Sequence, residues 1–190
     1  MGVRQIGARV QRVEDENLIR GDGKYLDDIQ LPNMAYVAFL RSSMAHAKIN
    51  ISDITKAKSM PGVFEVFTYQ TLPSSLVSKT QLETYPAPII KQSMCPDLLA
   101  NEEVAHVGQA IAMVVASSRH IAEDACELIE VEYTALKPII DVLKAAEPDS
   151  ELTHSNLKDN IAASIEAKFG DVETAFSESD DTLKLTFKQH

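Results

Sequence analysis

Residues 104–133, VAHVGQAIAMVVASSRHIAEDACELIEVEY, decide the fold that this sequence predicts. Between Val107 and Ala116 only Gln109 is clearly polar, which is typical of a strand that is covered on both faces. A strand with one face in water would alternate apolar and polar side chains instead. We therefore predict that this strand lies in the middle of the core.

A short helix and a second strand are predicted directly after the buried strand. Two residues, Ser117 and Ser118, offer N-caps for the helix. Apolar side chains then recur at helical spacing: Ile121, Ala125 and Leu128. The helix should therefore fold back over the strand with one apolar face. Residues 129–133 alternate apolar side chains with glutamates, which predicts a strand with one face in water.

The preceding part of the chain predicts a similar set of elements. Residues 34–41, MAYVAFLR, and residues 48–52, KINIS, have the composition and alternation of strands. Asp53 can cap a helix over residues 54–60, which a Pro-Gly pair ends, and residues 63–67 read as a further strand. The fold class predicted is α/β (α+β), with a mixed sheet and short helices packed on it.

The sequence divides into four parts by its glycines, prolines and polar runs. They are an extended N-terminal arm (1–33), an α/β core (34–151), a linker (152–168) and a C-terminal part (169–190). In the last part Asp171 caps a predicted helix, and TLKLTF, residues 182–187, reads as a strand. Within the core, residues 72–103 contain four prolines and predict a long irregular connection.

Composition excludes several classes of function. The 190 residues carry 18 Lys and Arg against 28 Asp and Glu, a net charge of −10, without a basic cluster for a nucleic-acid backbone. No apolar run approaches the roughly 20 residues that cross a bilayer, and the first residues are too charged for a signal peptide. We expect a cytoplasmic protein that binds neither nucleic acid nor membrane.

No catalytic, metal-binding or cofactor-binding residue can be assigned from the sequence. Cys95 and Cys126 form no CxxC pattern, so reduced and unreactive thiols are expected. The five histidines include no pair at the spacing of a zinc helix motif. The neighbours Asp27 and Asp28 point to different sides of an extended chain, which favours a turn or an edge charge over a site.

Three residues are candidates for an interface: Arg41, His46 and Gln109. His46 lies in a loop of small residues between two strands, where a polar side chain must be hydrogen-bonded internally or face a partner. The internal hydrogen bond is the preferred interpretation. Arg41 can hold loop carbonyls or carboxylates at a strand end, and Gln109 is the one unusual polar group of the buried strand.

Four segments of the chain resemble, in order, the opening of the large subunits of molybdenum hydroxylases, the family of carbon monoxide dehydrogenase, xanthine dehydrogenase and aldehyde oxidase. These segments are RVEDENLIRGDGKYLDDIQLPNMAYVAFLRSSMAHAKI, MPGVFEVFT, HVGQAIAMVVASSRHIAEDACELIEVEYTALKPIID and FGDVETAFSESD. In the first of them the matching positions are Arg12, Glu14, Asp15, Gly21, Gly23, Tyr25, Asp27, Asp28, Leu31, Pro32, Arg41, Ser42, His46 and Ala47. One departure is Ala110, where many relatives have proline.

The resemblance implies an α/β hammerhead domain, which in this family precedes the two domains that hold the molybdenum cofactor. The family's glycine-rich cofactor loops, catalytic glutamate and metal-adjacent cysteine lie after the part that this sequence matches. We therefore expect a structural part or split subunit that is not catalytic alone. Its expected partner is a polypeptide with a molybdopterin-type molybdenum cofactor, with FAD and iron-sulfur subunits in the full complex. The alternative is an independent module of hammerhead fold that binds a small molecule or a protein.

Overall fold

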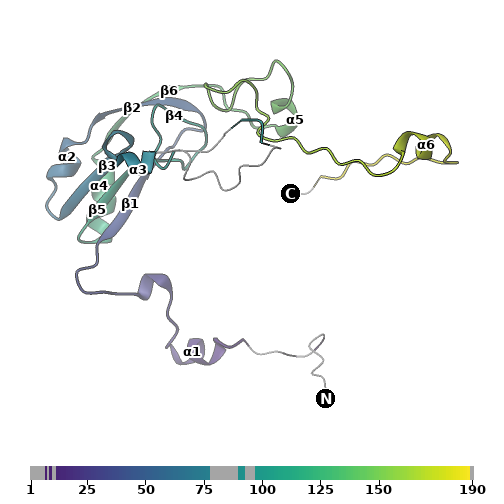
Figure 1. Ribbon diagram of the computed structural model, residues 1–190. Helices are drawn as coiled ribbons and strands as arrows, with labels where there is room; N and C mark the ends of the chain where they lie inside the picture. Colours follow the sequence, from purple (N-terminus) through teal and green to yellow (C-terminus); the bar gives the residue numbers. More distant parts are fainter. Residues whose placement is uncertain (1–6, 8, 10–11, 78–89, 93–96, 189–190) are drawn as a thin grey trace.

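The computed structural model describes residues 7, 9, 12–77, 90–92 and 97–188. Two small sheets and the helices packed on them form a core, and an arm leaves each end of it (Figure 1). We call residues 12–33 the N-terminal arm and residues 164–188 the C-terminal arm. Among the described residues, no helix has the length and apolar character that crossing a bilayer requires.

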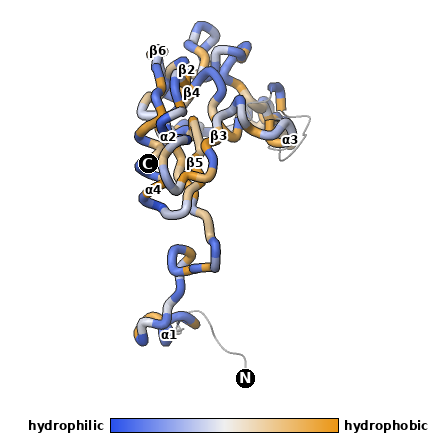
Figure 2. The backbone as a smooth tube through the Cα atoms, turned by 90° about the vertical axis from the view of Figure 1, so that its left-hand side faces the viewer, coloured by the Kyte–Doolittle hydropathy of each residue, from blue (hydrophilic) through white to orange (hydrophobic). Residues whose placement is uncertain are grey.

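The first sheet is built around the strand that the sequence placed in the middle. Its strands are β1 (Tyr36–Arg41), β5 (Ala110–Ala116) and β3 (Val63–Thr68), in the order β1-β5-β3, and both pairings are antiparallel. The central position predicted for β5 is therefore confirmed. Figure 2 shows the hydrophobic part of the chain gathered around β5 and β3.

Two helices cover one face of this sheet, α2 (Thr55–Ser59) and α4 (Arg119–Glu127). Small residues let the helices approach the sheet closely, because alanine adds little beyond the backbone. Those with no exposed surface are Ala57, Ala112, Ala116, Ala122 and Ala125. As predicted, the Ser118 hydroxyl caps α4 by accepting the Ile121 N–H.

The second sheet is formed by β4 (Glu103–Val104), β2 (Ala47–Asp53) and β6 (Glu130–Ala135), in the order β4-β2-β6. Its inner face packs with Ile111 of β5 in a second apolar cluster. The predicted alternation in β6 is confirmed, since Val131 and Tyr133 are half-buried and Glu130 and Glu132 are exposed.

The sheets differ from the prediction in one respect. All the strand pairs in the described residues are antiparallel, so the α/β class is confirmed but the strands form two antiparallel sheets in place of one mixed sheet. The face of β5 away from the helices is also only partly covered, because Met113 and Val115 are half-buried while Ile111 is fully buried.

Short helices occupy the connections and arms. They are α1 (Asp15–Arg20), the 3-10 helices η1 (Leu26–Asp28) and η2 (Tyr69–Thr71), α3 (Ser74–Val77), α5 (Val142–Ala145) and α6 (Val172–Ser177). Asp171 caps α6 as predicted, by accepting the Thr174 N–H. The predicted long connection 72–103 lies partly outside the described residues, as does Cys95.

The strand predicted over residues 182–187 is absent, and this prediction is wrong for the chain as described. Residues 181–188 have no regular secondary structure and are exposed. Their alternating apolar side chains suit a pleated strand, but a strand forms only where a neighbouring backbone supplies hydrogen bonds.

Candidate functional site

Arg41 and Gln109 lie close together where the end of β1 is next to the start of β5, its antiparallel neighbour. The Arg41 guanidinium donates from Nη1 to the Gly108 carbonyl at 2.9 Å. The Ser42 N–H donates to the Gln109 carbonyl and the Gly108 N–H to the Ser42 carbonyl, each at 2.8 Å. Gly108 has a φ of 88°, a conformation that glycine adopts without strain. Arg41 thus holds a loop carbonyl, as expected of a guanidinium at a strand end.

The Gln109 side chain stabilises the same loop from inside. Its Oε1 accepts the Ala105 N–H at 2.7 Å, while the backbone N–H of Gln109 donates to the His106 carbonyl at 3.3 Å. The polar side chain directly before β5 therefore satisfies a backbone donor of the loop. An interface role for Arg41 and Gln109 stays a prediction.

His46 lies in the loop before β2, where 7% of its surface is exposed. Its Nδ1 is 3.0 Å from the Lys137 carbonyl, and its Nε2 is 2.7 Å from Oε1 of Glu103 in β4. The His46 carbonyl accepts the Leu136 N–H at 2.9 Å. The internal hydrogen bond preferred for His46 is therefore present, and an interface role for this residue stays a prediction.

Glu103 connects this histidine to the segment that the sequence predicted as a linker. The Ser155 N–H donates to its Oε1 at 3.0 Å and its Oε2 at 3.3 Å. Burial raises the pKa of Glu103, but the hydrogen bonds from His46 and Ser155 outweigh burial, and the pKa lies below its usual value. For His46, burial lowers the pKa, whereas the Lys137 carbonyl and Glu103 raise it, and the net pKa is above 6.5.

Further contacts hold the same segment against the core. The Asn160 amide donates to the carbonyls of Ala145 and Glu151 at 3.0 and 2.8 Å, and Gln92 donates to the Asp159 carbonyl at 2.7 Å. An isolated bridge joins Ile90 and Ala163. The polar residues of this stretch therefore bind the core, and the domain boundaries at 151 and 168 stay predictions.

The N-terminal arm is attached to the core by an exposed ion pair. Arg119 of α4 binds Asp27 through two hydrogen bonds of 2.8 and 3.3 Å, and this arrangement lowers the pKa of Asp27. Asp28 instead accepts the Tyr25 N–H within η1. Asp27 thus attaches the arm to the core, and Asp28 stabilises a turn. Both roles agree with the interpretation of this pair as a turn or an edge charge. Sequence reasoning did not identify Arg119 or Glu103, because neither pairing has a local spacing signal.

Two observations on the described residues concern metal binding and thiol chemistry. No group of three or more His, Cys, Asp or Glu side chains among them is placed to hold a metal ion. Burial, with a smaller contribution from Glu123, raises the pKa of Cys126 to about 11, so its thiol is protonated near neutral pH and unreactive. That the chain alone binds no cofactor stays a prediction.

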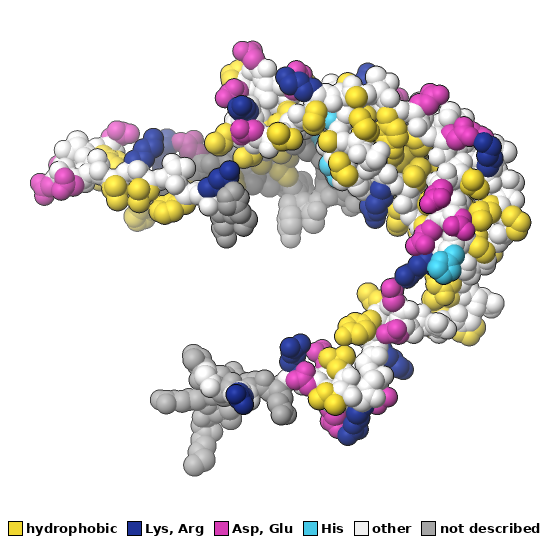
Figure 3. All heavy atoms as spheres, turned by 180° about the vertical axis from the view of Figure 1, so that it is seen from behind, with side chains coloured by type: hydrophobic (Ala, Val, Ile, Leu, Met, Phe, Trp, Pro, Cys, Tyr) yellow, Lys and Arg dark blue, Asp and Glu magenta, His cyan; other side chains and the backbone are white. Residues whose placement is uncertain are grey.

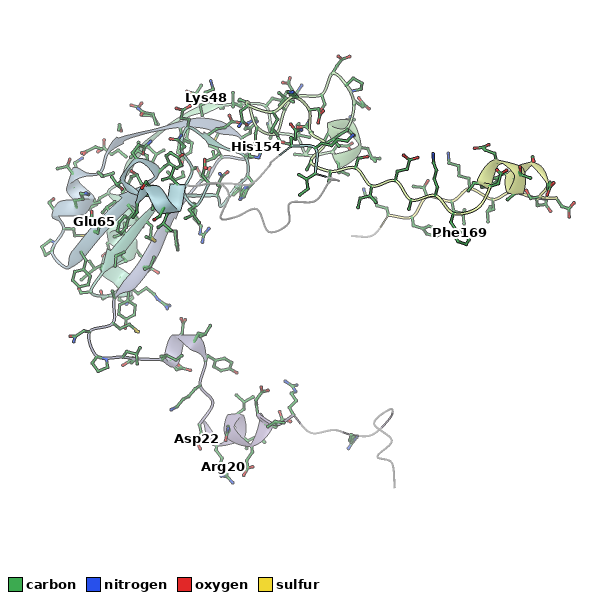
Figure 4. All side chains as sticks on the ribbon, viewed as in Figure 1. Arg20, Asp22, Lys48, Glu65, His154 and Phe169 are labelled. Atoms are coloured by element: carbon green, nitrogen blue, oxygen red, sulfur yellow. The ribbon has the colours of Figure 1, made fainter. Side chains whose placement is uncertain are left out.

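Large apolar side chains are exposed along both arms. Figure 3 shows the arms projecting on the same side of the core, with apolar side chains along the C-terminal arm. Exposure exceeds four fifths at Leu26, Phe169, Leu183 and Phe187, which are 86%, 97%, 82% and 87% exposed. Phe169 lies far out along the C-terminal arm (Figure 4). Exposed apolar surface of this kind occurs where a protein, a membrane or a ligand binds.

The chain has many relatives of known function, and it spans about a fifth of their length. It is 40% identical over 156 residues to the carbon monoxide dehydrogenase large chain of Afipia carboxidovorans, across 82% of this chain and 18% of that protein. It is 35% identical over 189 residues to the nicotine 6-hydroxylase large subunit of Paenarthrobacter nicotinovorans, across 96% of this chain and 22% of that protein.

A solved structure and a family description agree with these relatives. Quinoline 2-oxidoreductase from Pseudomonas putida 86 superposes with a TM-score of 0.71 at 34% identity, over 90% of this chain and 21% of that one. The family model of the aldehyde oxidase and xanthine dehydrogenase a/b hammerhead domain matches residues 20–137. The chain therefore belongs to the family of molybdenum hydroxylase large subunits, and residues 20–137 are its α/β hammerhead domain.

Proposed function

We propose that this chain is the N-terminal structural part, or a split subunit, of a molybdenum-dependent oxidoreductase that acts on an aldehyde, an N-heterocycle or carbon monoxide. Membership of the hammerhead family supports this function, as does the coverage of about a fifth of the relatives' length. The catalytic groups and the molybdopterin-type cofactor lie in the other polypeptide segment. FAD and iron-sulfur subunits complete the electron path in the assembled enzyme.

The exposure of apolar side chains on both arms is the observation that carries this proposal. In the N-terminal arm, Leu26 and Leu31 are 86% and 65% exposed. In the C-terminal arm, Phe169 and Phe176 are 97% and 62% exposed. Leaving such side chains in water costs about 1.5–3 kcal/mol each relative to burying them. Docking against a larger polypeptide removes this cost, which favours an assembled state.

The end of the C-terminal arm is suited to pair with a strand of the partner. Leu183, Leu185 and Phe187 alternate with polar residues, and all three are more than half exposed. Such a segment can add to the edge of another sheet, where backbone hydrogen bonds give affinity and alternate side chains enter pockets. The strand predicted over residues 182–187 would then form in the complex.

Co-purification tests the proposal directly. The tagged full chain is expressed in its native host and isolated, and molybdenum is measured by mass spectrometry in the co-purified material. We expect a larger polypeptide carrying molybdenum, and hydroxylase activity in the complex. Leu185→Asp should remove most of that polypeptide, because a charge would replace an apolar contact, while the neighbouring Thr186→Asp is the matched control. A monodisperse monomer without a molybdenum-bearing partner would contradict the proposal.

A second candidate function, an independent small-molecule binding module, rests on one surface depression. It measures about 630 Å³ and is lined by Tyr69, Gln70, Leu72, Ser74, Val77 and Asn101. Within it, the Gln70 amide donates to Oδ1 of Asn101 at 3.2 Å. Small-molecule screening by ligand-observed NMR distinguishes the two functions: saturable binding that Leu72→Asp abolishes supports the module, and its absence supports the structural part.

A further inference from the structure

The hydrogen-bond partners of His46 determine where its protons are. The Lys137 carbonyl, 3.0 Å from Nδ1, can only accept a hydrogen bond, so Nδ1 carries a proton. Nε2 faces the Glu103 carboxyl oxygen at 2.7 Å. A neutral imidazole with its proton on Nδ1 presents a lone pair at Nε2, and a lone pair repels a carboxylate. This short contact therefore requires one further proton between Nε2 and Oε1.

The Ser155 N–H indicates which of the two groups holds that proton. It donates to both oxygens of Glu103, at 3.0 and 3.3 Å, and hydrogen bonds of this kind favour the ionised carboxylate. The proton accordingly resides on His46, and the contact joins an imidazolium to a carboxylate. Such charge-assisted hydrogen bonds are about twice as strong as neutral ones.

Three separate segments meet at this ion pair. His46 precedes β2, Glu103 is in β4, and both Lys137 and Ser155 lie after β6. The segment that contains Lys137 and Ser155 leads directly into the C-terminal arm. We propose that His46 and Glu103 form a proton-held latch that fixes the segment around Ser155 on the core through the Ser155 N–H. The latch releases this segment when His46 loses its Nε2 proton, because the lone pair left at Nε2 repels the Glu103 carboxylate. The effect of the latch on partner docking rests on the proposed function, whereas the latch itself does not.

Other charged groups surround the latch. Lys137 Nζ and Glu151 Oε1 form an ion pair of 3.3 Å, and Glu151 also favours the charged form of His46. Lys48 of β2 is the register partner of Glu103. His154, next to Ser155, has an interaction of its own. These groups shift the midpoint of release, but none of them supplies the Nε2 proton.

Glu103→Gln gives a variant in which the latch no longer depends on pH. A neutral His46 can accept a hydrogen bond at Nε2 from the glutamine NH₂ group, while Nδ1–H still donates to Lys137. The glutamine carbonyl remains available to the Ser155 N–H. Glu103→Ala removes the hydrogen bonds of residue 103 to His46 and to the Ser155 N–H. His120→Gln is the matched control, because His120 is exposed on α4.

The test follows the full chain by NMR between pH 6 and pH 9. The ring signals of His46 report its protonation, and the heteronuclear NOEs of the amides in residues 150–157 report their mobility. We expect these NOEs to fall with the same midpoint as the His46 titration in the wild type and in His120→Gln. They should stay high at all pH values in Glu103→Gln and be low throughout in Glu103→Ala.

Two results would overturn the latch. One is an Nε2 of His46 that is unprotonated at pH 6, and the other is a constant mobility of residues 150–157 while His46 titrates in the wild type. Both measurements use the isolated chain and so leave the proposed function unaffected. Conversely, a failure to bind the molybdenum polypeptide at pH 6, with an intact latch, contradicts the proposed function alone.

Discussion

The core and the two arms contain the same kinds of apolar residue in opposite environments. In the core, Val66 and Ile111 have no exposed surface, whereas Phe169 and Phe187 in the C-terminal arm are 97% and 87% exposed. The core residues have neighbours on two packed sheets and two helices. The difference teaches that an apolar pattern specifies a surface to be covered but does not specify what covers it.

The comparison also separates the two regions energetically. Packed apolar contacts and strand pairings offset the conformational entropy lost when the core folds. The arms have few such contacts. They are therefore expected to contribute little to the free energy of unfolding of the isolated chain. Substitutions in the core should therefore change the free energy of unfolding, and matched substitutions in the arms should change binding instead.

The largest effect is expected from a cavity in the core. Ile111→Ala removes a fully buried side chain between the two sheets and should lower the free energy of unfolding by about 2–5 kcal/mol. Urea denaturation followed by circular dichroism measures the change. Phe169→Ala in the C-terminal arm is the control and should stay within about 0.5 kcal/mol of the wild type. Equal losses of unfolding free energy in the two variants would contradict the difference between the core and the arms.

The next effect concerns the ion pair that attaches the C-terminal segment to the core. Glu103→Ala leaves Nε2 of His46 and the Ser155 N–H without a partner and should cost about 1.5–3 kcal/mol. Urea denaturation at pH 6 measures this loss. Glu151→Ala is the control, because Glu151 is more than half exposed, pairs with Lys137 at the surface and makes the smallest of the contributions to the charge of His46.

The same pair gives a signed dependence of stability on pH. The interactions that raise the pKa of His46 stabilise the fold fully below pH 6.5. This contribution is lost as the pH rises through the pKa of His46 in the folded state. The interactions that lower the pKa of Glu103 stabilise the fold fully above pH 4.5. This contribution is lost as the pH falls through the pKa of Glu103 in the folded state. Both contributions are complete between pH 4.5 and pH 6.5, and urea midpoints measured from pH 4 to pH 9 should show this window.

A smaller effect is expected at two glycines that share a left-handed backbone. Gly62 has a φ of 91°, and a Cβ there would lie 2.8 Å from Ile121 Cδ1 and Ser117 Oγ. Gly62→Ala should therefore destabilise the core by about 1–2 kcal/mol. Gly170, in the C-terminal arm, has a φ of 68° and no neighbouring atom within 4 Å. Gly170→Ala should leave the unfolding of the core unchanged. Thermal unfolding curves of the two variants test this difference.

The smallest effect is expected where the N-terminal arm touches the core. Arg119→Ala removes the exposed pair with Asp27 and should leave the unfolding midpoint unchanged, because solvent screens such pairs. It should instead increase the amide mobility of residues 25–29 in NMR relaxation, and added salt should do the same in the wild type. Arg20→Ala is the control, since Arg20 pairs with Glu16 inside the arm. Unchanged mobility would show that this pair does not tether the arm.

Prediction from the sequence succeeded where short-range patterns carry the information. The apolar run ending at Ala116 located the central strand, and Ser118 and Asp171 located two helix starts. The turn of Arg41 toward a loop carbonyl also followed from residue chemistry. For the two caps the partner is a backbone N–H three residues away, so residue type and spacing are sufficient. For the central strand and for Arg41, residue type indicated the kind of environment or partner, whereas the fold supplied the particular partner.

Prediction failed where the partner is distant in the sequence or belongs to another molecule. Glu103 and Ser155 are brought to His46 only by the folded sheet, and nothing in the residues around His46 points to them. The division into two antiparallel sheets depends on how β2 pairs with β6, which alternation does not specify. Residues 182–187 have the pattern of a strand but lack a neighbouring backbone among the residues that the structure describes.

The position of β5 has a consequence for the order of events during synthesis. In the described part of the chain β1 and β3 pair only with β5, so residues 36–41 and 63–68 leave the ribosome before the strand that lies between them. Until residue 116 has emerged, their apolar faces lack a partner and are open to aggregation. Such long-range pairing also makes folding slow relative to local helical structure. The nascent chain is therefore expected to need a chaperone during translation of this stretch.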